Sequence, residues 1–228
     1  KIQAEQNRRE FTANVSHELK TPLQSIIGSA DLIESGLVKP EDMPRFIGHI
    51  KTDAARLVSL VSDIIRLSQL DENTEMNWEN VDALSVAKEA LEMVGPIAES
   101  RNISLTIKGE PAPLTSVHKL LYDIIYNLCD NAVKYNKEGG FVKVNVKTAG
   151  DKVQVAVSDN GVGIAPADQS RVFERFYRVD KSHSRESGGT GLGLSIVKHA
   201  VAYLKGSISL ESTLGKGTAI TVSFPTEK

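Results

Sequence analysis

The chain has 228 residues, of which 40% are hydrophobic and 25% are charged, and its formal net charge is −2. This composition is typical of a globular protein, and the nearly balanced charge excludes the basic footprint of a nucleic-acid-binding protein. The single cysteine, Cys129, excludes a disulfide framework or a cysteine-rich metal site, and no apolar stretch of the sequence is long enough to cross a bilayer.

An apolar stripe at helical spacing opens the chain. Its members are Phe11, Val15, Leu19, Leu23, Ile26, Ala30, Ile33 and Leu37. A helix with this stripe places His17 on the opposite, solvent side, with Glu18 beside it and Thr21 one turn later on the same face. A histidine on the solvent face has no packing role. It is either an ordinary surface residue or an imidazole available for chemistry, with a carboxylate as its neighbour.

Two features of this first helix predict more than a packing element. Residues 1–10 are polar, favour a helix and run into the stripe without a capping residue, so we expect the chain to be a piece of a longer protein. Pro22 removes the hydrogen bond to the Glu18 carbonyl and is expected to kink the helix just after His17. The kink is either merely tolerated or lets the His17 region shift.

A second helix is expected after a break near Gly36, and Pro40 suits its first turn. Its apolar residues are Met43, Ile47, Ile50, Ala54, Leu57, Leu60, Val61, Ile64, Leu67 and Leu70. An isolated helical hairpin has too small a core to be stable alone, so wide stripes on both helices predict self-association. The simplest form is a homodimer in which two hairpins make a four-helix bundle.

The helical pattern lapses at the polar residues 71–75, where we place a domain boundary, between residues 1–73 and residues 74–228. Beyond it, the pattern predicts helices over residues 83–101, 116–135 and 192–204, a partly helical segment over 165–177, and strands over 103–107, 141–148, 152–158, 207–212 and 218–224. This order predicts an α/β fold of the α+β kind, a two-layer sandwich whose helices cover one face of a mixed sheet.

One face of the helix expected over residues 116–135 is polar. Asn127, Asn131 and Lys134 lie three or four positions apart and share that face. Amide oxygens can bind a hard cation and an ammonium group can bind phosphate, so this face suits a metal–phosphate ligand. The alternative is a plain solvated helix face.

Two glycine-containing segments lie at the ends of expected elements. Residues 159–164 follow a strand, and Asp159 can accept a hydrogen bond from an exocyclic amine such as that of adenine, although the same residues also suit a plain turn. Residues 188–195 open a helix, where glycine-rich backbone can cradle phosphate. This second segment is neither a P-loop, because no Gly-Lys-Ser/Thr follows, nor a dinucleotide fingerprint.

A lid is expected between these two segments. Phe173 and Phe176 would anchor it, and residues 179–187 are polar and have no helical period. Arg178, at the start of the lid, is a candidate contact for a γ-phosphate.

Taken in order, these segments resemble the sequence boxes of the sensor histidine kinases of two-component signalling. Residues 11–23 resemble the phosphoacceptor box, 127–135 the asparagine box, 159–164 the first glycine box, 173–178 the phenylalanine box, 189–194 the second glycine box, and 215–218 the turn before the last strand. Each box is weak alone, but their order and spacing over essentially the whole chain are specific.

The resemblance implies a dimerising hairpin followed by an ATP-binding sandwich of the GHKL type, which type II topoisomerases and mismatch-repair ATPases share. Carried over, Asn127 coordinates Mg²⁺, and Asp159 accepts from the N6 amine of adenine, which Gly163 allows to approach. The other residues expected at the nucleotide contact phosphate, line the site or shape the base of the lid. They are Asn131, Lys134, Tyr135, Gly161, Arg178, Gly189, Thr190, Gly191, Leu192 and Gly193.

The resemblance also implies the chemistry. His17 is the phosphoacceptor, Glu18 orients its ring, and the phosphoryl group then passes to an aspartate of a response-regulator receiver domain. Thr21 resembles the residue that positions water for dephosphorylating the regulator, which implies a phosphatase activity as well. Most relatives are anchored in the cytoplasmic membrane through an N-terminal region, so we expect the chain to be the cytoplasmic portion of such a sensor.

Two other functional classes remain open from the sequence. One is an ATPase of the same sandwich type that drives a conformational clamp without phosphotransfer, and the other is a catalytically inactive scaffold. Neither class requires an exposed His17 next to Glu18.

Overall fold

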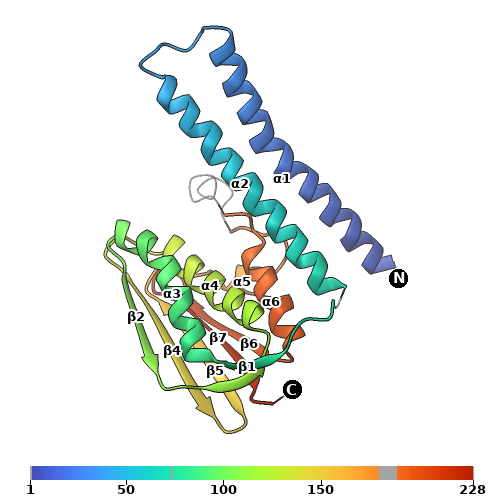
Figure 1. Ribbon diagram of the computed structural model, residues 1–228, viewed down its shortest axis with the longest axis vertical. Coiled ribbons are helices and arrows are strands. Elements are labelled where there is room, and N and C mark those ends of the chain that lie inside the picture. The colour runs from blue at the N-terminus through green and yellow to red at the C-terminus, as the bar shows by residue number, and fades with distance from the viewer. Residues whose placement is uncertain (1, 73, 180–188, 228) are drawn as a thin grey trace.

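Figure 1 shows a long helical hairpin standing against a layered α/β body, in a computed structural model that describes residues 2–72, 74–179 and 189–227. Helices α1 (Ile2–Glu34) and α2 (Met43–Asp71) form the hairpin. Within the described residues, no helix is both long enough and apolar enough to span a bilayer. Nearly all of the lid expected over residues 179–187 lies outside the described residues.

The residues between α1 and α2 form the turn of the hairpin. Gly36 follows the end of α1 with φ +71°, a conformation that glycine adopts without strain. The second helix begins later than the sequence analysis predicts, because the proline in its first turn is Pro44 and Pro40 lies in the preceding turn. The Asp42 N–H donates to the Lys39 carbonyl at 2.9 Å, which closes that turn before α2 begins.

The body is a sandwich of a five-stranded sheet and helices that cover one of its faces (Figure 1). The strand order is β2–β4–β5–β7–β6, in which only β2 and β4 are parallel neighbours. The strands are β2 (Ser104–Gly109), β4 (Phe141–Ala149), β5 (Lys152–Asp159), β6 (Ser207–Thr213) and β7 (Gly217–Pro225), and the covering helices are α3 (Ala83–Ser100), α4 (His118–Lys134) and α6 (Gly193–Tyr203). The expected α+β two-layer sandwich is confirmed.

Local structure differs from the expectation in two places. The small antiparallel sheet of β1 (Glu79–Asp82) and β3 (Pro113–Ser116) is not expected from the sequence, because such short strands show no period. The segment expected to be partly helical over residues 165–177 contains only α5 (Pro166–Gln169). Phe176 has φ +63°, outside the helical region, and its N–H donates to the Gly191 carbonyl at 2.8 Å, which ties it to the loop before α6.

An apolar seam joins the hairpin to the sandwich. Leu60, Leu67 and Leu70 of α2 are 2%, 0% and 5% exposed and belong to the same buried cluster as the core of the sandwich. Their spacing puts them on one face of α2, which packs against α6. The hairpin and the sandwich therefore share one hydrophobic core.

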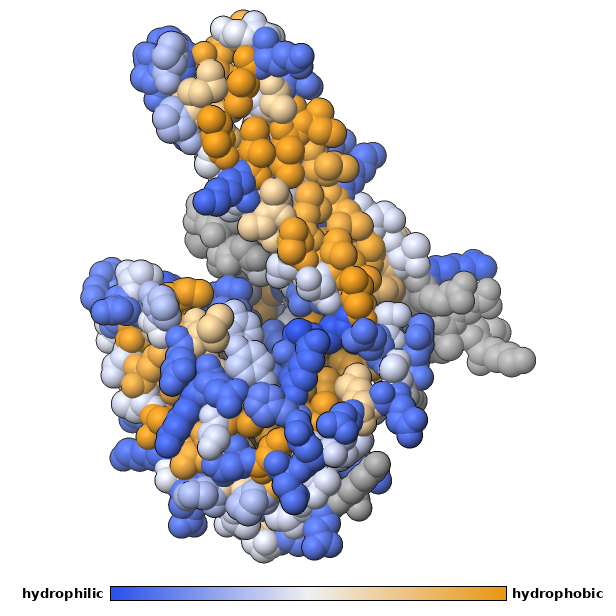
Figure 2. Space-filling view, in the orientation of Figure 1, coloured by the Kyte–Doolittle hydropathy of each residue, from blue (hydrophilic) through white to orange (hydrophobic). Residues whose placement is uncertain are grey.

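Another apolar face of the hairpin is exposed. Figure 2 shows apolar residues gathered along the hairpin. The exposed members include Leu23, Ile27, Ile47, Val58, Val61 and Ile65, which are between 45% and 68% exposed. Three of these, Leu23, Ile47 and Val61, belong to the stripes expected from the sequence, so packing within one hairpin covers only part of those stripes. An uncovered apolar face of this kind marks an interaction surface.

The seam predicts the effect of truncating its central leucine. Leu67→Ala removes a fully buried side chain and should lower the free energy of unfolding by about 2–5 kcal/mol, because it leaves a cavity between hairpin and sandwich. Urea unfolding measures this change. Leu37→Ala, at a position that is 74% exposed, is the control and should change the free energy little. Equal unfolding midpoints for the Leu67 variant and the unmodified chain would show that the seam does not stabilise the fold.

Candidate active site

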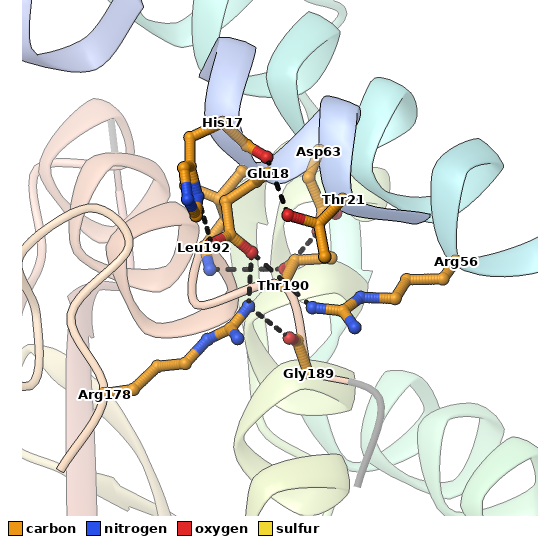
Figure 3. Close-up of polar contacts among 9 residues, drawn as sticks. All are labelled: His17, Glu18, Thr21, Arg56, Asp63, Arg178, Gly189, Thr190 and Leu192. Carbon is orange, nitrogen blue, oxygen red and sulfur yellow. Dashed lines mark hydrogen bonds and ion pairs between the residues drawn. The ribbon is translucent and has the colours of Figure 1, made fainter. Parts of the chain in front are cut away.

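The outer face of α1 presents His17 to solvent, as the stripe predicts. The side chain of His17 is 79% exposed, and its Nδ1 lies 3.7 Å from Oε1 of Glu18. The Thr21 hydroxyl donates to the His17 carbonyl at 3.2 Å, so the three side chains expected together do lie together (Figure 3). Pro22 lies inside α1, which continues through it, and the kink expected there stays a prediction.

Glu18 also connects three elements of the structure. Its Oε2 lies 3.5 Å from Nη2 of Arg56 on α2 and 3.1 Å from Nη2 of Arg178, which precedes the lid (Figure 3). Arg178 also donates to the carbonyl of Gly189, on the far side of the lid. Arg178 is the candidate phosphate contact, but in this structure its guanidinium contacts Glu18, the neighbour of His17.

The polar face of α4 points at the glycine-rich loop before α6. Asn127 donates through Nδ2 to the Asp123 carbonyl at 2.8 Å, which directs its Oδ1 toward Gly193. A Cβ on Gly193 would lie 2.8 Å from that Oδ1 and 3.8 Å from Nδ2 of Asn131. Lys134, on the same face, forms an ion pair with Asp130 at 2.6 Å. The structure therefore brings the first and last predicted nucleotide segments together.

This face fits a metal ion that is shared with phosphate. The described residues contain no group of three or more His, Cys, Asp or Glu side chains that could hold a metal by themselves. Since the Asn127 nitrogen donates to the backbone, its amide oxygen is the atom turned toward the loop. Mg²⁺ usually keeps several waters and is bound through one or two carboxylates together with substrate phosphates. The Asn127 amide oxygen is also a hard oxygen donor and would take the place of such a carboxylate.

Asp159 ends β5 with one carboxylate oxygen already bound. Its Oδ1 accepts from the N–H groups of Gly161 at 2.8 Å and Thr218 at 3.3 Å. Burial raises the pKa of Asp159 and these two hydrogen bonds lower it, with burial the larger cause. Because both bonds end on Oδ1, Oδ2 is the oxygen that suits a hydrogen bond from an exocyclic amine.

The two glycines after Asp159 have backbone roles. A Cβ on Gly161 would collide with the Tyr135 carbonyl, which accepts from the Val162 N–H at 3.1 Å, so the loop after β5 lies against the end of α4. Gly163 has φ +68°, and a Cβ there would overlap the Thr213 carbonyl of β6. In this structure Gly163 is required by the backbone of β6, and its expected role in admitting a base stays a prediction.

The loop before α6 is held by polar contacts to the hairpin. The Thr190 hydroxyl donates to Oδ2 of Asp63 on α2 at 2.8 Å and accepts from the Leu192 N–H at 3.2 Å (Figure 3). Burial raises the pKa of Asp63, against the lowering effects of this hydrogen bond and of the nearby cations Arg66 and Lys134.

Three predicted residues of this region, Leu192, Gly191 and Tyr135, offer different groups to a ligand. Leu192 is fully buried, so only its backbone is available and its side chain belongs to the core. Gly191 has φ +74°, which glycine adopts without strain, and its carbonyl accepts from the Phe176 N–H. Tyr135 is 44% exposed, and its hydroxyl would lie 3.7 Å from a Cβ on Gly189.

Sequence reasoning missed the contacts between the phenylalanine-box region and the hairpin. Arg175 contacts both carboxylate oxygens of Asp71, at 2.7 and 2.8 Å, and its guanidinium lies 4.9 Å from the centre of the Phe11 ring. The Phe11 and Phe176 rings are 5.8 Å apart. Phe11 is only a stripe residue in the sequence analysis, and the arginine–aromatic run at residues 175–178 is the one local signal that could have suggested an interface.

A second missed residue is a buried acid on α4. Asp123 forms an ion pair at 3.0 Å with Arg66 of α2, and its side chain is only 6% exposed. Burial raises the pKa of Asp123 to about 6, although Arg66 and Lys119 lower it. It borders a cavity of about 440 Å³ between the end of α2 and the start of α4. Because Asp123 falls in an apolar helical run, no sequence pattern marks it.

Two family models match this chain. Residues 7–73 match the His Kinase A (phospho-acceptor) domain, and residues 116–228 match the Histidine kinase-, DNA gyrase B-, and HSP90-like ATPase domain. The sequence is 39% identical over 223 residues to the sensor-like histidine kinase SenX3 of Mycolicibacterium smegmatis, an alignment that covers 97% of this chain and 58% of that protein. The chain therefore spans little more than half the length of that relative.

Two solved structures are similar to this chain. Full-length ShkA in complex with AMPPNP is 29% identical, with a TM-score of 0.71 over 95% of this chain and 45% of that one. The histidine kinase ThkA in complex with the response regulator protein TrrA has a TM-score of 0.77 over 95% of this chain and 61% of that one. At 22% identity, the second likeness is one of fold.

The buried acid predicts a pH dependence of stability. The pKa of Asp123 is about 6 in the folded chain against 3.8 for an ordinary aspartate, so between these values the folded state binds more protons than the unfolded state. Stability then falls as pH rises through this window. Relative to Asp123→Asn, the unmodified chain should lose about 2 kcal/mol of unfolding free energy between pH 4 and pH 7.

Urea unfolding of both proteins across this pH range measures the difference. Asp31→Asn, at an exposed position on α1, is the control and should follow the unmodified chain throughout. A pH-independent difference between the Asp123 variant and the unmodified chain would contradict the assignment of the raised pKa to this group.

Proposed function

We propose, from the premise that this chain belongs to the sensor histidine kinases of two-component signalling, that it uses ATP to phosphorylate His17 and passes the phosphoryl group to an aspartate of a response regulator. The observation that carries the proposal is the ion pair between Glu18 and Arg178. It joins the neighbour of an exposed imidazole to the arginine that begins the lid of an ATPase-type sandwich, so acceptor and nucleotide segments are within reach of one another.

The proposed nucleotide site uses the groups that converge between α4, the loop after β5 and the loop before α6. Oδ2 of Asp159 accepts from the adenine amine, and Lys134, Asn131 and Arg178 bind phosphate. The Asn127 amide oxygen is the proposed protein ligand of Mg²⁺. When bound, the Mg²⁺–ATP complex supplies a phosphoryl group whose negative charge is partly neutralised.

His17 performs the proposed transfer as a nucleophile. In its neutral form with the proton on Nδ1, Nε2 carries the lone pair that forms a bond to the γ-phosphorus of ATP. The bond between that phosphorus and the oxygen bridging the β- and γ-phosphates breaks, and ADP leaves. Glu18, whose Oε1 lies 3.7 Å from Nδ1, orients the ring and stabilises the positive charge that develops on it. The resulting phosphoramidate of His17 then donates its phosphoryl group to the aspartate of the receiver domain, which leaves a free imidazole.

The hairpin is also the proposed dimer interface. Its exposed apolar face, which includes Val58, Val61 and Ile65, would be covered if two hairpins formed a four-helix bundle. The response regulator is the proposed second partner, as TrrA is for ThkA. The division of the chain at residues 73 and 74 and the anchoring of the whole protein in a membrane also stay proposals.

Thr21 supports a second candidate activity at the same face. Its hydroxyl lies one turn from His17 and is exposed to solvent, where it can orient a water molecule toward the phosphoaspartate of a docked regulator. We propose that the chain dephosphorylates its regulator through this residue.

Labelling with γ-labelled ATP and Mg²⁺ tests the kinase. The chain should acquire acid-labile, alkali-stable label, and His17→Gln should abolish it because the phosphoryl acceptor is gone. His49→Gln, which alters another exposed histidine of the hairpin, is the control and should label normally. Release of free phosphate without labelled protein would support the ATPase clamp instead, and label that survives in His17→Gln would exclude His17 as the acceptor.

A variant of Thr21 tests the phosphatase. Thr21→Ala should label with ATP normally but lose most of the dephosphorylation of the regulator, because only the second reaction needs a positioned water. The matched control is Thr52→Ala, since Thr52 makes the same hydroxyl-to-carbonyl bond on α2, to Gly48 at 2.9 Å. Loss of both reactions in Thr21→Ala would argue against separate roles for His17 and Thr21.

A further inference from the structure

The position of Glu18 beside His17 is not secured by the helix itself. Residues next to each other in an α-helix project about 100° apart and do not face each other. The 3.7 Å separation of Oε1 and Nδ1 therefore depends on some other group that holds the carboxylate in place. The proposed role of Glu18 requires such a group during the transfer.

Two arginines hold the Glu18 carboxylate in this structure. Both contact Oε2, Arg178 at 3.1 Å and Arg56 at 3.5 Å, while Oε1 faces the imidazole. The two oxygens thus have separate tasks, one for the arginines and one for His17. Figure 3 shows the carboxylate between the two guanidinium groups and the ring.

Only one of these arginines can stay with Glu18 during the proposed reaction. Arg178 belongs to the sandwich, and the proposed function gives it to phosphate, for which it must leave Glu18. Arg56 belongs to α2, which packs against α1 within the hairpin. Its side chain is 17% exposed in this structure. Because Arg56 and Glu18 both belong to the hairpin, their contact can persist when Arg178 moves with the sandwich.

We propose that Arg56 is the positioning residue of the phosphoacceptor site, which holds Oε2 of Glu18 so that Oε1 stays on Nδ1 of His17 when Arg178 moves to phosphate. This inference rests on the proposed function and deepens it. Arg56 contacts neither nucleotide nor imidazole and acts through Glu18 alone. When the nucleotide is bound for transfer, Arg178 leaves the Glu18 carboxylate and Arg56 stays in contact with it.

Autophosphorylation kinetics of Arg56 variants test the proposal. Arg56→Met should lower kcat at saturating ATP about tenfold, a fraction of what an acid–base partner contributes, while KM for ATP stays unchanged. Arg56→Lys should restore most of the rate, because the observed contact uses one nitrogen and does not need the guanidinium fork. Arg45→Met, on the same helix with its guanidinium over the Phe46 ring, is the matched control and should be as active as the unmodified chain.

A double-mutant cycle separates positioning from a general effect on structure. If Arg56 acts through Glu18, then Arg56→Met should cause no further loss in a chain that already carries Glu18→Gln. The proposal would be overturned if the two substitutions together lowered kcat by the product of their separate effects, or if Arg56→Met left kcat unchanged. A rise in KM for ATP as large as the fall in kcat would overturn it as well. None of these outcomes affects the proposed function, whose own failure appears separately as label retained in His17→Gln.

Discussion

The arrangement of this chain depends on the burial of one face of α2 in the core of the sandwich. Leu60, Leu67 and Leu70 supply the apolar area, and removal of such area from water is the largest favourable contribution to docking one element on another. The polar contacts around the seam contribute less to stability, because partly exposed ion pairs are weak. They set the register in which the hairpin docks, as charged groups do at interfaces in general.

Those polar contacts follow a pattern of charge. Glu18, Asp63 and Asp71 of the hairpin meet Arg178, Thr190 and Arg175 of the sandwich, and a fourth contact, between Arg66 and Asp123, has the opposite sense. Carboxylates of the hairpin therefore contact groups of the sandwich that suit phosphate. A guanidinium or hydroxyl group that binds a hairpin carboxylate is less available to bind a phosphate. Occupancy of the proposed nucleotide site and docking of the hairpin are therefore physically linked.

Much of the fold could be predicted because its signals are local. Alternating burial along β5 and the polar face of α4 both follow from which side chains are apolar, and the structure agrees with them. The errors also have local causes. Pro40 and Pro44 suit the first turn of a helix equally well. The start of α2 at Met43 is set by the turn before it, in which the Asp42 N–H donates to the Lys39 carbonyl. Of the segment expected to be partly helical over residues 165–177, only α5 is a helix, and Phe176 lies outside the helical region with its N–H bound to the Gly191 carbonyl.

The order of the two hairpin helices, of the five sheet strands and of their three covering helices follows from the sequence alone, because it depends on periodicity within each element. The solvent-facing position of His17 and the clustering of the phosphate-type residues on one face of α4 follow for the same reason. Which arginines hold Glu18 depends on how the hairpin packs against the sandwich. Arg178 is 160 positions away in the chain, and no local pattern specifies which of many exposed charges will meet once the hairpin docks. Pairings at that distance are set by the shape of the packed core, which exists only after the two parts have come together.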